Sequence, residues 1–470
     1  MMMQQIVAPP ALPPSKMGFH LPTIRAAELP GMVSVDVREL FPDIPAPIHN
    51  YGQDLATVRR AAQNALADVD MCKIAPNDSV NVLCSEHGFG MMGGAAYAEV
   101  LRTVKDVVEQ RTGCKNLRLA FSSGLSKIEG QEIMPQHGLD TYFGGRVVQF
   151  GPYDKGVEIE TEIGTLYGIG AAYKARRIIH VHYDDPREVH FHRANGRALK
   201  AFAMSYARFE TRGVFHNNFP TQSANLVPRM IYESPFVQEK FAFAASLTTS
   251  PAGVTGVEAD NDLLAMDKRV AAKQLRYYGK LIRLFDEIDE CVVIIDGHRW
   301  VWYGHAGGLT ACNLFFGPTE HLDLDVRHAG LKPNPAVKAI VVNYMWKQAT
   351  TLAGVPTIST QPSITRLFEM RGVQKPFYAA ASLEAAMKIA YDVAKTDKVI
   401  IFDGTYGAIN CSPAMAGFLI EHAPAVSRLV DRELLPKWLR QRGLPLDGVR
   451  DSEDRRSARP LDDSVRPLDE

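Results

Sequence analysis

Residues 79–123, SVNVLCSEHGFGMMGGAAYAEVLRTVKDVVEQRTGCKNLRLAFSS, decide the fold. Apolar runs at 79–84 and 117–123 indicate buried strands, and residues 95–110 have the apolar spacing of an amphipathic helix. A strand, a helix and a second strand in this order form a βαβ unit, which places the two strands parallel in one sheet. The stretch therefore predicts an α/β fold with a largely parallel sheet flanked by helices.

The same alternation extends in both directions from this stretch. A helix is predicted at 57–68 and further strands at 147–151 and 175–183. A second alternating region begins near residue 275, with predicted helices at 277–288 and 383–395 and predicted strands at 290–297, 337–344 and 398–404. Because a single core stops growing at about 250–300 residues, we predict two α/β domains, 1–280 and 281–445. The charged tail, 446–470, has almost no aliphatic clusters and is predicted to be disordered.

Composition excludes several classes of protein. The chain has 470 residues, of which 46% are hydrophobic and 22% charged, as in an ordinary globular protein. The net charge of -1 disfavours nucleic acid or an anionic membrane as the main partner. No apolar run approaches the roughly 20 residues that span a bilayer. Six scattered cysteines and the lack of a convincing signal peptide predict a cytoplasmic protein with reduced thiols.

The turn after the first strand contains a glycine motif. Gly88, Gly90 and Gly93 match the pattern G-x-G-x-x-G between a strand and a helix, where backbone amides can approach a phosphate. Three interpretations stay open: the phosphate of a mononucleotide, a complete NAD site, or a tight turn only. Ser122 and Ser123 stand where an NAD site needs a ribose-binding acid, which counts against NAD.

Three residues further along are the strongest candidates for chemistry. His190 and Lys200 are separated by nine residues, and Lys200 and His216 by fifteen. This spacing is too long for one helical face and too loose for a zinc finger. A loop and a helix predicted at 198–209 would explain it, if together they gather all three around one bound cofactor. Each also has an ordinary interpretation, in which the lysine lies on a solvated face and the histidines bind no metal.

Two His-x-His pairs offer another hypothesis. His180 and His182 lie in a predicted strand, and His190 and His192 follow it. Since residues i and i+2 of a strand share a face, either pair could chelate zinc. The alternative is that the first pair projects from a strand end into polar surroundings.

The segment around these residues resembles the nickel-dependent lactate racemase family. Glu188, His190, Gly196 and Lys200 match the family's motif, and His216 follows at the family's interval from the lysine. The order of strand, phosphate loop, strand and Ser-Gly-Leu loop also matches, so that the resemblance covers about residues 50–220.

The resemblance implies a two-domain α/β protein with its site in the cleft between the domains. It also implies a nickel pincer nucleotide, which is a pyridinium mononucleotide that binds nickel through one carbon and two sulfurs. Lys200 would be its covalent tether, His216 a nickel ligand and His190 the acid/base residue. The implied reaction moves a hydride from C2 of a 2-hydroxy acid to the cofactor and back. The remaining cofactor-binding residues implied by position are Glu86, His87, Gly88, Gly90 and Ser126.

The sequence departs from the family pattern at three places, one of which is the Gly-Gly before the lysine, reduced here to Gly196-Arg197-Ala198. The family's second catalytic histidine falls at Ser126, and Lys127 or His87 would have to take its role. An arginine of the first loop is absent, because Glu86-His87-Gly88-Phe89 stands in its place. These departures favour a sugar acid or a bulkier hydroxy acid over lactate as the substrate.

The sequence therefore predicts an isomerase, a racemase or epimerase of a 2-hydroxy acid, which depends on cofactor-biosynthesis proteins as partners. Two alternatives remain: an NAD-dependent oxidoreductase that uses the Gly88–Gly93 loop, and a non-catalytic protein that binds a nucleotide or a metal.

Overall fold

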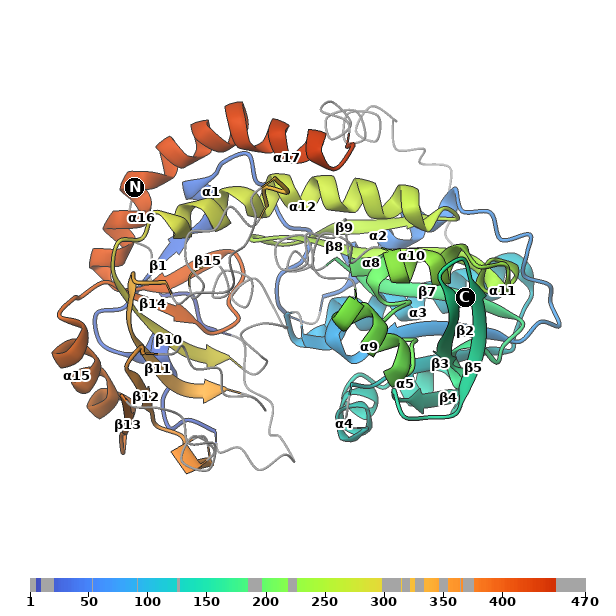
Figure 1. Ribbon diagram of the computed structural model, residues 1–470, viewed down its shortest axis with the longest axis horizontal. Coiled ribbons are helices and arrows are strands. Elements are labelled where there is room, and N and C mark those ends of the chain that lie inside the picture. The colour runs from blue at the N-terminus through green and yellow to red at the C-terminus, as the bar shows by residue number, and fades with distance from the viewer. Residues whose placement is uncertain are drawn as a thin grey trace.

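A computed structural model describes the chain at residues 6–9, 21–52, 54–90, 92–124, 127–184, 197–218, 226–297, 314, 322–325, 334–345, 354–363, 365–366 and 376–444. Within these residues the protein has an α/β fold with two largely parallel sheets flanked by helices, which confirms the predicted fold class. Figure 1 shows the two sheets in separate lobes of the molecule.

The first sheet contains the βαβ unit predicted at residues 79–123. Its strand order is β4-β3-β2-β7-β8-β9, and every neighbouring pair is parallel except β8 and β9. The strands are β2 (Val80–Ser85), β3 (Leu117–Ser122), β4 (Val147–Phe150), β7 (Arg177–Tyr183), β8 (Phe241–Ser250) and β9 (Gly253–Asp260). A separate antiparallel hairpin consists of β5 (Gly156–Thr161) and β6 (Gly164–Ile169).

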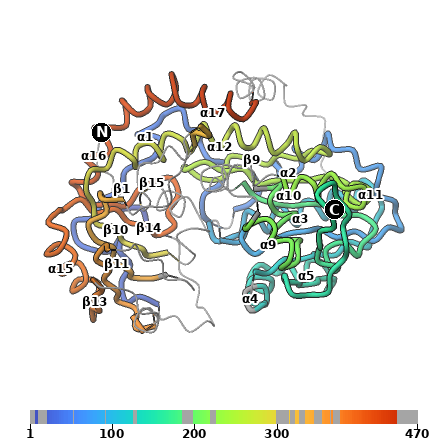
Figure 2. Tube along the Cα trace, viewed as in Figure 1, coloured from blue at the N-terminus to red at the C-terminus, as the bar shows by residue number. Residues whose placement is uncertain are grey.

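The second sheet combines the two ends of the chain. Its order is β1-β15-β14-β10-β11-β12-β13, with β1 and β15 antiparallel to their neighbours. The strands are β1 (Val33–Asp36), β10 (Cys291–Gly297), β11 (Val337–Met345), β12 (Thr357–Ser359), β13 (Phe377–Ala379), β14 (Val399–Phe402) and β15 (Ala408–Cys411). Figure 2 shows the blue N-terminal segment beside the orange and red C-terminal segments in this lobe.

The helices cover the sheets and connect the two lobes. The helices that precede β10 in the chain are α1 (Val37–Leu40), α2 (Ala56–Ala67), α3 (Ala95–Thr112), α4 (Ile128–Gln136), α5 (Leu139–Tyr142), α6 (Gly170–Tyr173), α8 (Arg197–Lys200), α9 (Phe209–Asn218), α10 (Leu226–Glu233), α11 (Pro235–Lys240) and α12 (Leu263–Asp286). Those after them are α15 (Leu383–Ala394), α16 (Pro413–Leu429) and α17 (Leu435–Gln441), with the π-helical turn η5 (Val430–Leu434) between the last two. Short 3-10 turns are η1 (Ala26–Glu28), η2 (Glu86–Gly90) and η3 (Met92–Gly94).

Helix α12 joins the two lobes. It begins where the Asp262 side chain accepts hydrogen bonds from the backbone N–H groups of Leu264 and Ala265. It contacts α8, β8 and β9 in the first lobe and α16 and α17 in the second. The predicted domain boundary after residue 280 falls within this helix, while β1 pairs in the sheet of the C-terminal half. The division into 1–280 and 281–445 stays a prediction.

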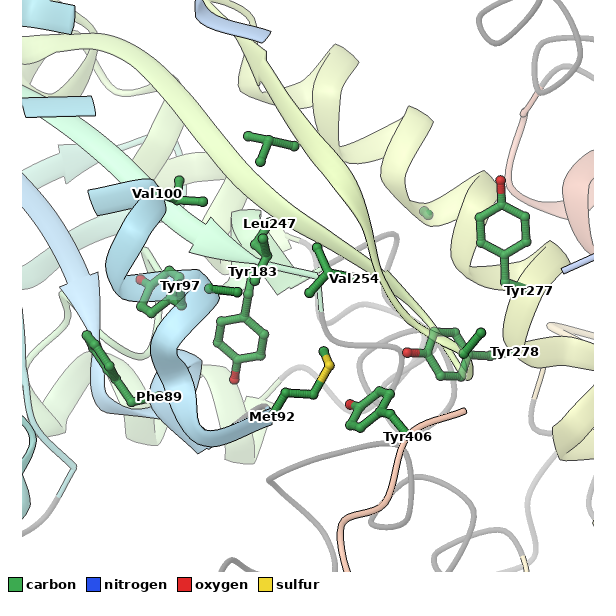
Figure 3. Packing of buried hydrophobic residues seen from close by; sticks show 14 of the residues in the cluster. Phe89, Met92, Tyr97, Val100, Tyr183, Leu247, Val254, Tyr277, Tyr278 and Tyr406 are labelled. Carbon is green, nitrogen blue, oxygen red and sulfur yellow. The ribbon is translucent and has the colours of Figure 1, made fainter. Parts of the chain in front are cut away.

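One hydrophobic core runs from the first sheet to the second. It includes Phe89 and Tyr97 near β2, Tyr278 of α12 and Tyr406 near β14. Figure 3 shows these side chains in one packed cluster. The ring of Tyr97 contacts the ring of Phe89, with centroids 5.0 Å apart, and its hydroxyl donates to the carbonyl of Val181, 2.7 Å away. The residues of the glycine-rich turn are therefore part of the core.

One predicted helix is much shorter in the structure. The sequence predicts a helix that begins before Lys200 and continues to about residue 209, but α8 ends at Lys200 and residues 201–206 form turns. The Tyr206 carbonyl accepts a hydrogen bond from the Ile169 N–H (2.8 Å), and Ala207 forms a β-bridge with Gly168. Pairing with β6 thus outweighs the helical propensity of this segment.

None of the helices in the described ranges has both the length and the apolar character needed to cross a membrane. The predicted disordered tail, 446–470, lies outside the described residues.

Candidate functional site

A pocket lies at the carboxyl ends of the strands of the first sheet, where open α/β sheets bind their ligands. Its volume is about 60 Å³. The lining residues come from the loop after β2, from the ends of β3 and β7, and from the segment between α8 and α9. They are His87, Ser122, Ser123, Gly124, His182, Lys200, Ala201, Met204, Ser205 and Arg212. The lining includes two basic side chains, Lys200 and Arg212, which suit an anionic group.

Lys200 is the buried cation of this pocket. Only 6% of its surface is exposed, although a lysine side chain is almost never buried without a purpose or a partner. It is the last residue of α8, and its Nζ lies 5.6 Å from the centroid of the Phe215 ring of α9. A buried amine at the end of a helix can attack or pair with a bound ligand in a fixed position.

Helix α8, which ends at Lys200, contacts Asp267 of α12. Asp267 is 2% exposed, and its carboxylate faces the backbone N–H of Leu199, which adjoins Lys200. Among the described residues, no hydrogen-bond donor reaches its Oδ1. Burial raises the pKa of Asp267 to about 7, and the hydrogen bond from Leu199 opposes this shift.

The raised pKa predicts a pH-dependent cost in stability. In the unfolded chain Asp267 loses its proton near pH 3.8, whereas in the folded protein it keeps it to about pH 7. The free energy of unfolding therefore falls as the pH rises between these values. We expect Asp267→Asn to stabilise the protein at pH 8 by roughly 4 kcal/mol at most, and to have little effect at pH 4.

Urea unfolding of Asp267→Asn and the native protein at the two pH values measures this difference. The matched control is Asp392→Asn, which changes an exposed aspartate of α15 and should not alter the difference between the two pH values. A gain that is equal at pH 4 and pH 8 would contradict the prediction.

Arg212 supplies a second cation to the pocket. It lies on α9, and its Nε donates to the carbonyl oxygen of Ala207 at 3.1 Å. Burial lowers its pKa to about 10, and the charges of Glu86 and Tyr153 oppose this shift. Arg212 is thus protonated at neutral pH, and a guanidinium can hold a carboxylate or phosphate through two parallel hydrogen bonds.

The two histidines of β7 have different surroundings. Both are fully buried, and each lies among polar groups. His180 lies 2.7 Å from the Tyr206 hydroxyl through Nδ1 and 2.9 Å from the Ala198 carbonyl through Nε2, and burial lowers its pKa to about 3. It is therefore neutral and anchors the segment that contains Lys200. His182 lines the pocket.

No metal site of three or more histidine, cysteine or acidic side chains occurs among the residues that the structure describes. The zinc hypothesis for His180 and His182 therefore has no further ligands in this part of the chain.

The first loop places Glu86 and His87 at the pocket. His87 lines it, and Glu86 is buried beside it, close to Gly124. A β-carbon at Gly124 would lie 2.4 Å from Oε1 of Glu86, so the loop after β3 can approach this carboxylate only with glycine at position 124.

The glycines of this loop have packing roles. A β-carbon at Gly88 would lie 2.3 Å from the Tyr97 ring, and Gly90 ends the 3-10 turn η2. Gly93 and Gly94 have φ values of 76° and 80°, in the left-handed region that favours glycine. The tight-turn interpretation of the motif is thus sufficient to explain these glycines, and a role for Gly88 and Gly90 in cofactor binding stays a prediction.

Lys127 and His216 lie outside the pocket lining, as do Glu86, Gly88 and Gly90 of the first loop. Lys127 is exposed, and its Nζ forms an ion pair with Asp154 at 2.9 Å. His216 is exposed on α9, and its Nδ1 lies 2.7 Å from the Arg212 carbonyl oxygen. Since a carbonyl oxygen only accepts, Nδ1 carries the proton and the lone pair remains on Nε2. Metal-binding histidines commonly have this arrangement.

The remaining predicted site residues, His190 and Ser126, fall outside the described residues. Their roles stay predictions from the sequence.

Sequence reasoning did not identify Arg212. The resemblance implies an arginine in the first loop, where this chain has none, whereas the structure places an arginine from α9 in the pocket. Helical spacing in the sequence could have indicated Arg212, because it precedes His216 by four residues and so lies on the same helix face.

No family model and no curated protein matches this sequence. Among solved structures, the chain is similar to the lactate racemase apoprotein from Thermoanaerobacterium thermosaccharolyticum, with a TM-score of 0.43 and 12% sequence identity. The similarity covers 74% of this chain and 92% of that protein.

Proposed function

We propose that this protein is an isomerase, a racemase or epimerase that acts at C2 of a 2-hydroxy acid. The observation that carries the proposal is the buried amine of Lys200 in a pocket that also contains the protonated guanidinium of Arg212. The Arg212 guanidinium at the carboxyl edge of a parallel sheet favours an anionic ligand. The spacing of His190, Lys200 and His216 then favours a tethered nickel pincer nucleotide as the cofactor.

The residues present fit such a group in three respects. The Lys200 amine is buried beside the pocket, where it can form an amide-type bond with an acyl group of the cofactor. The buried carboxylate of Glu86 can accept hydrogen bonds from hydroxyl groups. His216 keeps a lone pair on Nε2, and neutral imidazole suits nickel. The cofactor, when bound, supplies a hydride acceptor.

The chain's own residues bind and orient the substrate in this proposal. The Arg212 guanidinium holds the substrate carboxylate, so that C2 and its hydroxyl have a fixed orientation in the pocket. His190 exchanges the hydroxyl proton, because an imidazole with an ordinary pKa near 6.5 is suited to proton transfer at neutral pH. Lys127 or His87 would serve the opposite face of the substrate. His87 already lines the pocket, whereas Lys127 would first have to leave Asp154.

Intact-mass spectrometry tests the proposal on protein produced together with the cofactor-building enzymes. We expect a mass increase that maps to Lys200, and inversion at C2 of a 2-hydroxy acid with retention of a deuterium label placed at C2, because the hydride returns to the same carbon. Unmodified protein from this preparation would contradict the tethered cofactor. Tight binding of NAD by the untreated protein would instead support the oxidoreductase alternative.

A further inference from the structure

We propose that the rim of this pocket holds an aromatic ring, so that the substrate is an aryl-substituted 2-hydroxy acid. This inference rests on the proposed function for the identity of the hydroxy acid. The substrate class of this site follows from Tyr153 and Phe209, two side chains to which the family resemblance assigns no role.

The observation is a pair of stacked aromatic side chains that remain exposed. Tyr153 is 64% exposed and Phe209 is 52% exposed. Their rings stack with centroids 5.4 Å apart and an interplanar angle of 24°. Among the six exposed large hydrophobic side chains of the described residues, no other two form a ring contact. An exposed apolar pair on a folded protein is a candidate surface for a ligand.

Both rings are attached to well-fixed backbone. Tyr153 lies in a turn in which the Asp154 N–H donates to the Gly151 carbonyl (3.1 Å) and the Asp154 carboxylate pairs with Lys127. Phe209 begins α9, and its N–H donates to the carbonyl of Pro152 at 3.1 Å. The two aromatic residues are thus held by hydrogen bonds between their own segments. A fixed aromatic surface loses little entropy when a ring stacks on it.

The aromatic pair adjoins the cationic part of the pocket. Phe209 precedes Arg212 by three residues, so both lie on the same face of α9. Tyr153 is near enough to Arg212 for its charge to affect the pKa of the guanidinium. A β-carbon at Gly151, two residues from Tyr153, would lie 3.6 Å from the carbonyl oxygen of Gly124, which lines the pocket.

The charges at the rim favour one kind of ligand. The nearby carboxylates of Asp154 and Glu210 are paired with Lys127 and Arg208, both at 2.9 Å. The rim therefore combines the aromatic pair with these two ion pairs and the exposed Lys155, while the pocket contains the Arg212 guanidinium. A ligand that matches both carries a carboxylate for Arg212 and a planar ring for Tyr153 and Phe209. An aryl 2-hydroxy acid has both groups, and lactate has only the first.

Isothermal titration calorimetry with 3-phenyllactate and lactate tests the inference on protein with and without the loaded cofactor. We expect phenyllactate to bind about tenfold more tightly than lactate in both preparations, since ring stacking and apolar burial add to the shared carboxylate contact. The preference should disappear in Tyr153→Ala/Phe209→Ala. It should persist in Tyr153→Phe, which keeps the ring, and in Tyr378→Ala, which removes an exposed tyrosine from β13 of the second sheet.

Equal binding of the two acids, no binding of either, or a preference that survives in the double alanine variant would overturn the inference. A preference that is lost once the cofactor is loaded would assign the rings to the cofactor and would also overturn it. The proposed function fails separately. Tight binding of phenyllactate without inversion at C2 would contradict the isomerase and keep the aromatic site. Inversion of lactate without tighter binding of phenyllactate would support the isomerase and contradict the aromatic site.

Discussion

Replacing Lys200 by methionine is expected to abolish both the cofactor adduct and isomerase activity, with a loss of at least about a thousandfold in kcat/KM. The reason is that Lys200 provides the amine that we propose as the tether, at a position where it is 6% exposed. Methionine has nearly the same length and tolerates an apolar environment, so the fold should be preserved. Intact-mass spectrometry and the rate of inversion at C2 measure the two losses.

Two control variants separate tethering from charge and from general effects. Lys200→Arg keeps a positive charge in the pocket but lacks an amine that can form the tether, so we expect anion binding to remain and the adduct to be lost. Lys155→Met removes an exposed lysine from the turn before β5 and should leave the adduct unchanged. An adduct that persists in Lys200→Met would show that the tether, if there is one, lies elsewhere.

Replacing Gly88 by alanine is expected to destabilise the protein by about 3 kcal/mol. The added β-carbon would lie 2.3 Å and 2.4 Å from two atoms of the Tyr97 ring. That ring cannot move away easily, because it is fully buried, packs against Phe89 and Tyr183, and donates a hydrogen bond to Val181. The midpoint of urea unfolding measures the loss.

The control for this variant is Gly417→Ala in α16, where a β-carbon would meet no atom within 4 Å. It should be neutral or stabilising by about 0.5–1 kcal/mol, since alanine favours a helix over glycine. If Gly88→Ala kept full stability and lost only cofactor binding, the packing role of Gly88 would be wrong and the phosphate-loop prediction would gain support.

Much of the secondary structure follows from local hydrophobic patterns. The predicted strand at 117–123 corresponds to β3, the predicted helix at 57–68 to α2, and the predicted helix at 383–395 to α15, each within about two residues. Such patterns repeat over a few residues and need no knowledge of distant segments. The helix expected after Lys200 is the exception, because the backbone of Ala207 and Tyr206 pairs with β6 instead.

The site was predictable only in part. Lys200 and His87, which the sequence indicated as candidates, both line the pocket, and their role in cofactor binding stays a prediction. The contribution of Arg212 was not predicted, because its position depends on how α9 packs against the first sheet. The order of the strands was not predictable either: β1 and β15 are neighbours although they lie at opposite ends of the chain.

The sequence by itself determined the alternation of strands and helices and the parallel character of the sheets, and it indicated Lys200 as a candidate. These depend on the period of apolar residues and on residue chemistry, which are local properties. Only the tertiary structure decided that Arg212 joins Lys200 in one pocket, that Asp267 lies under α8, and that Tyr153 stacks on Phe209. These contacts join segments far apart in the chain, and their energy comes from packing that forms only when the sheet and α12 are assembled.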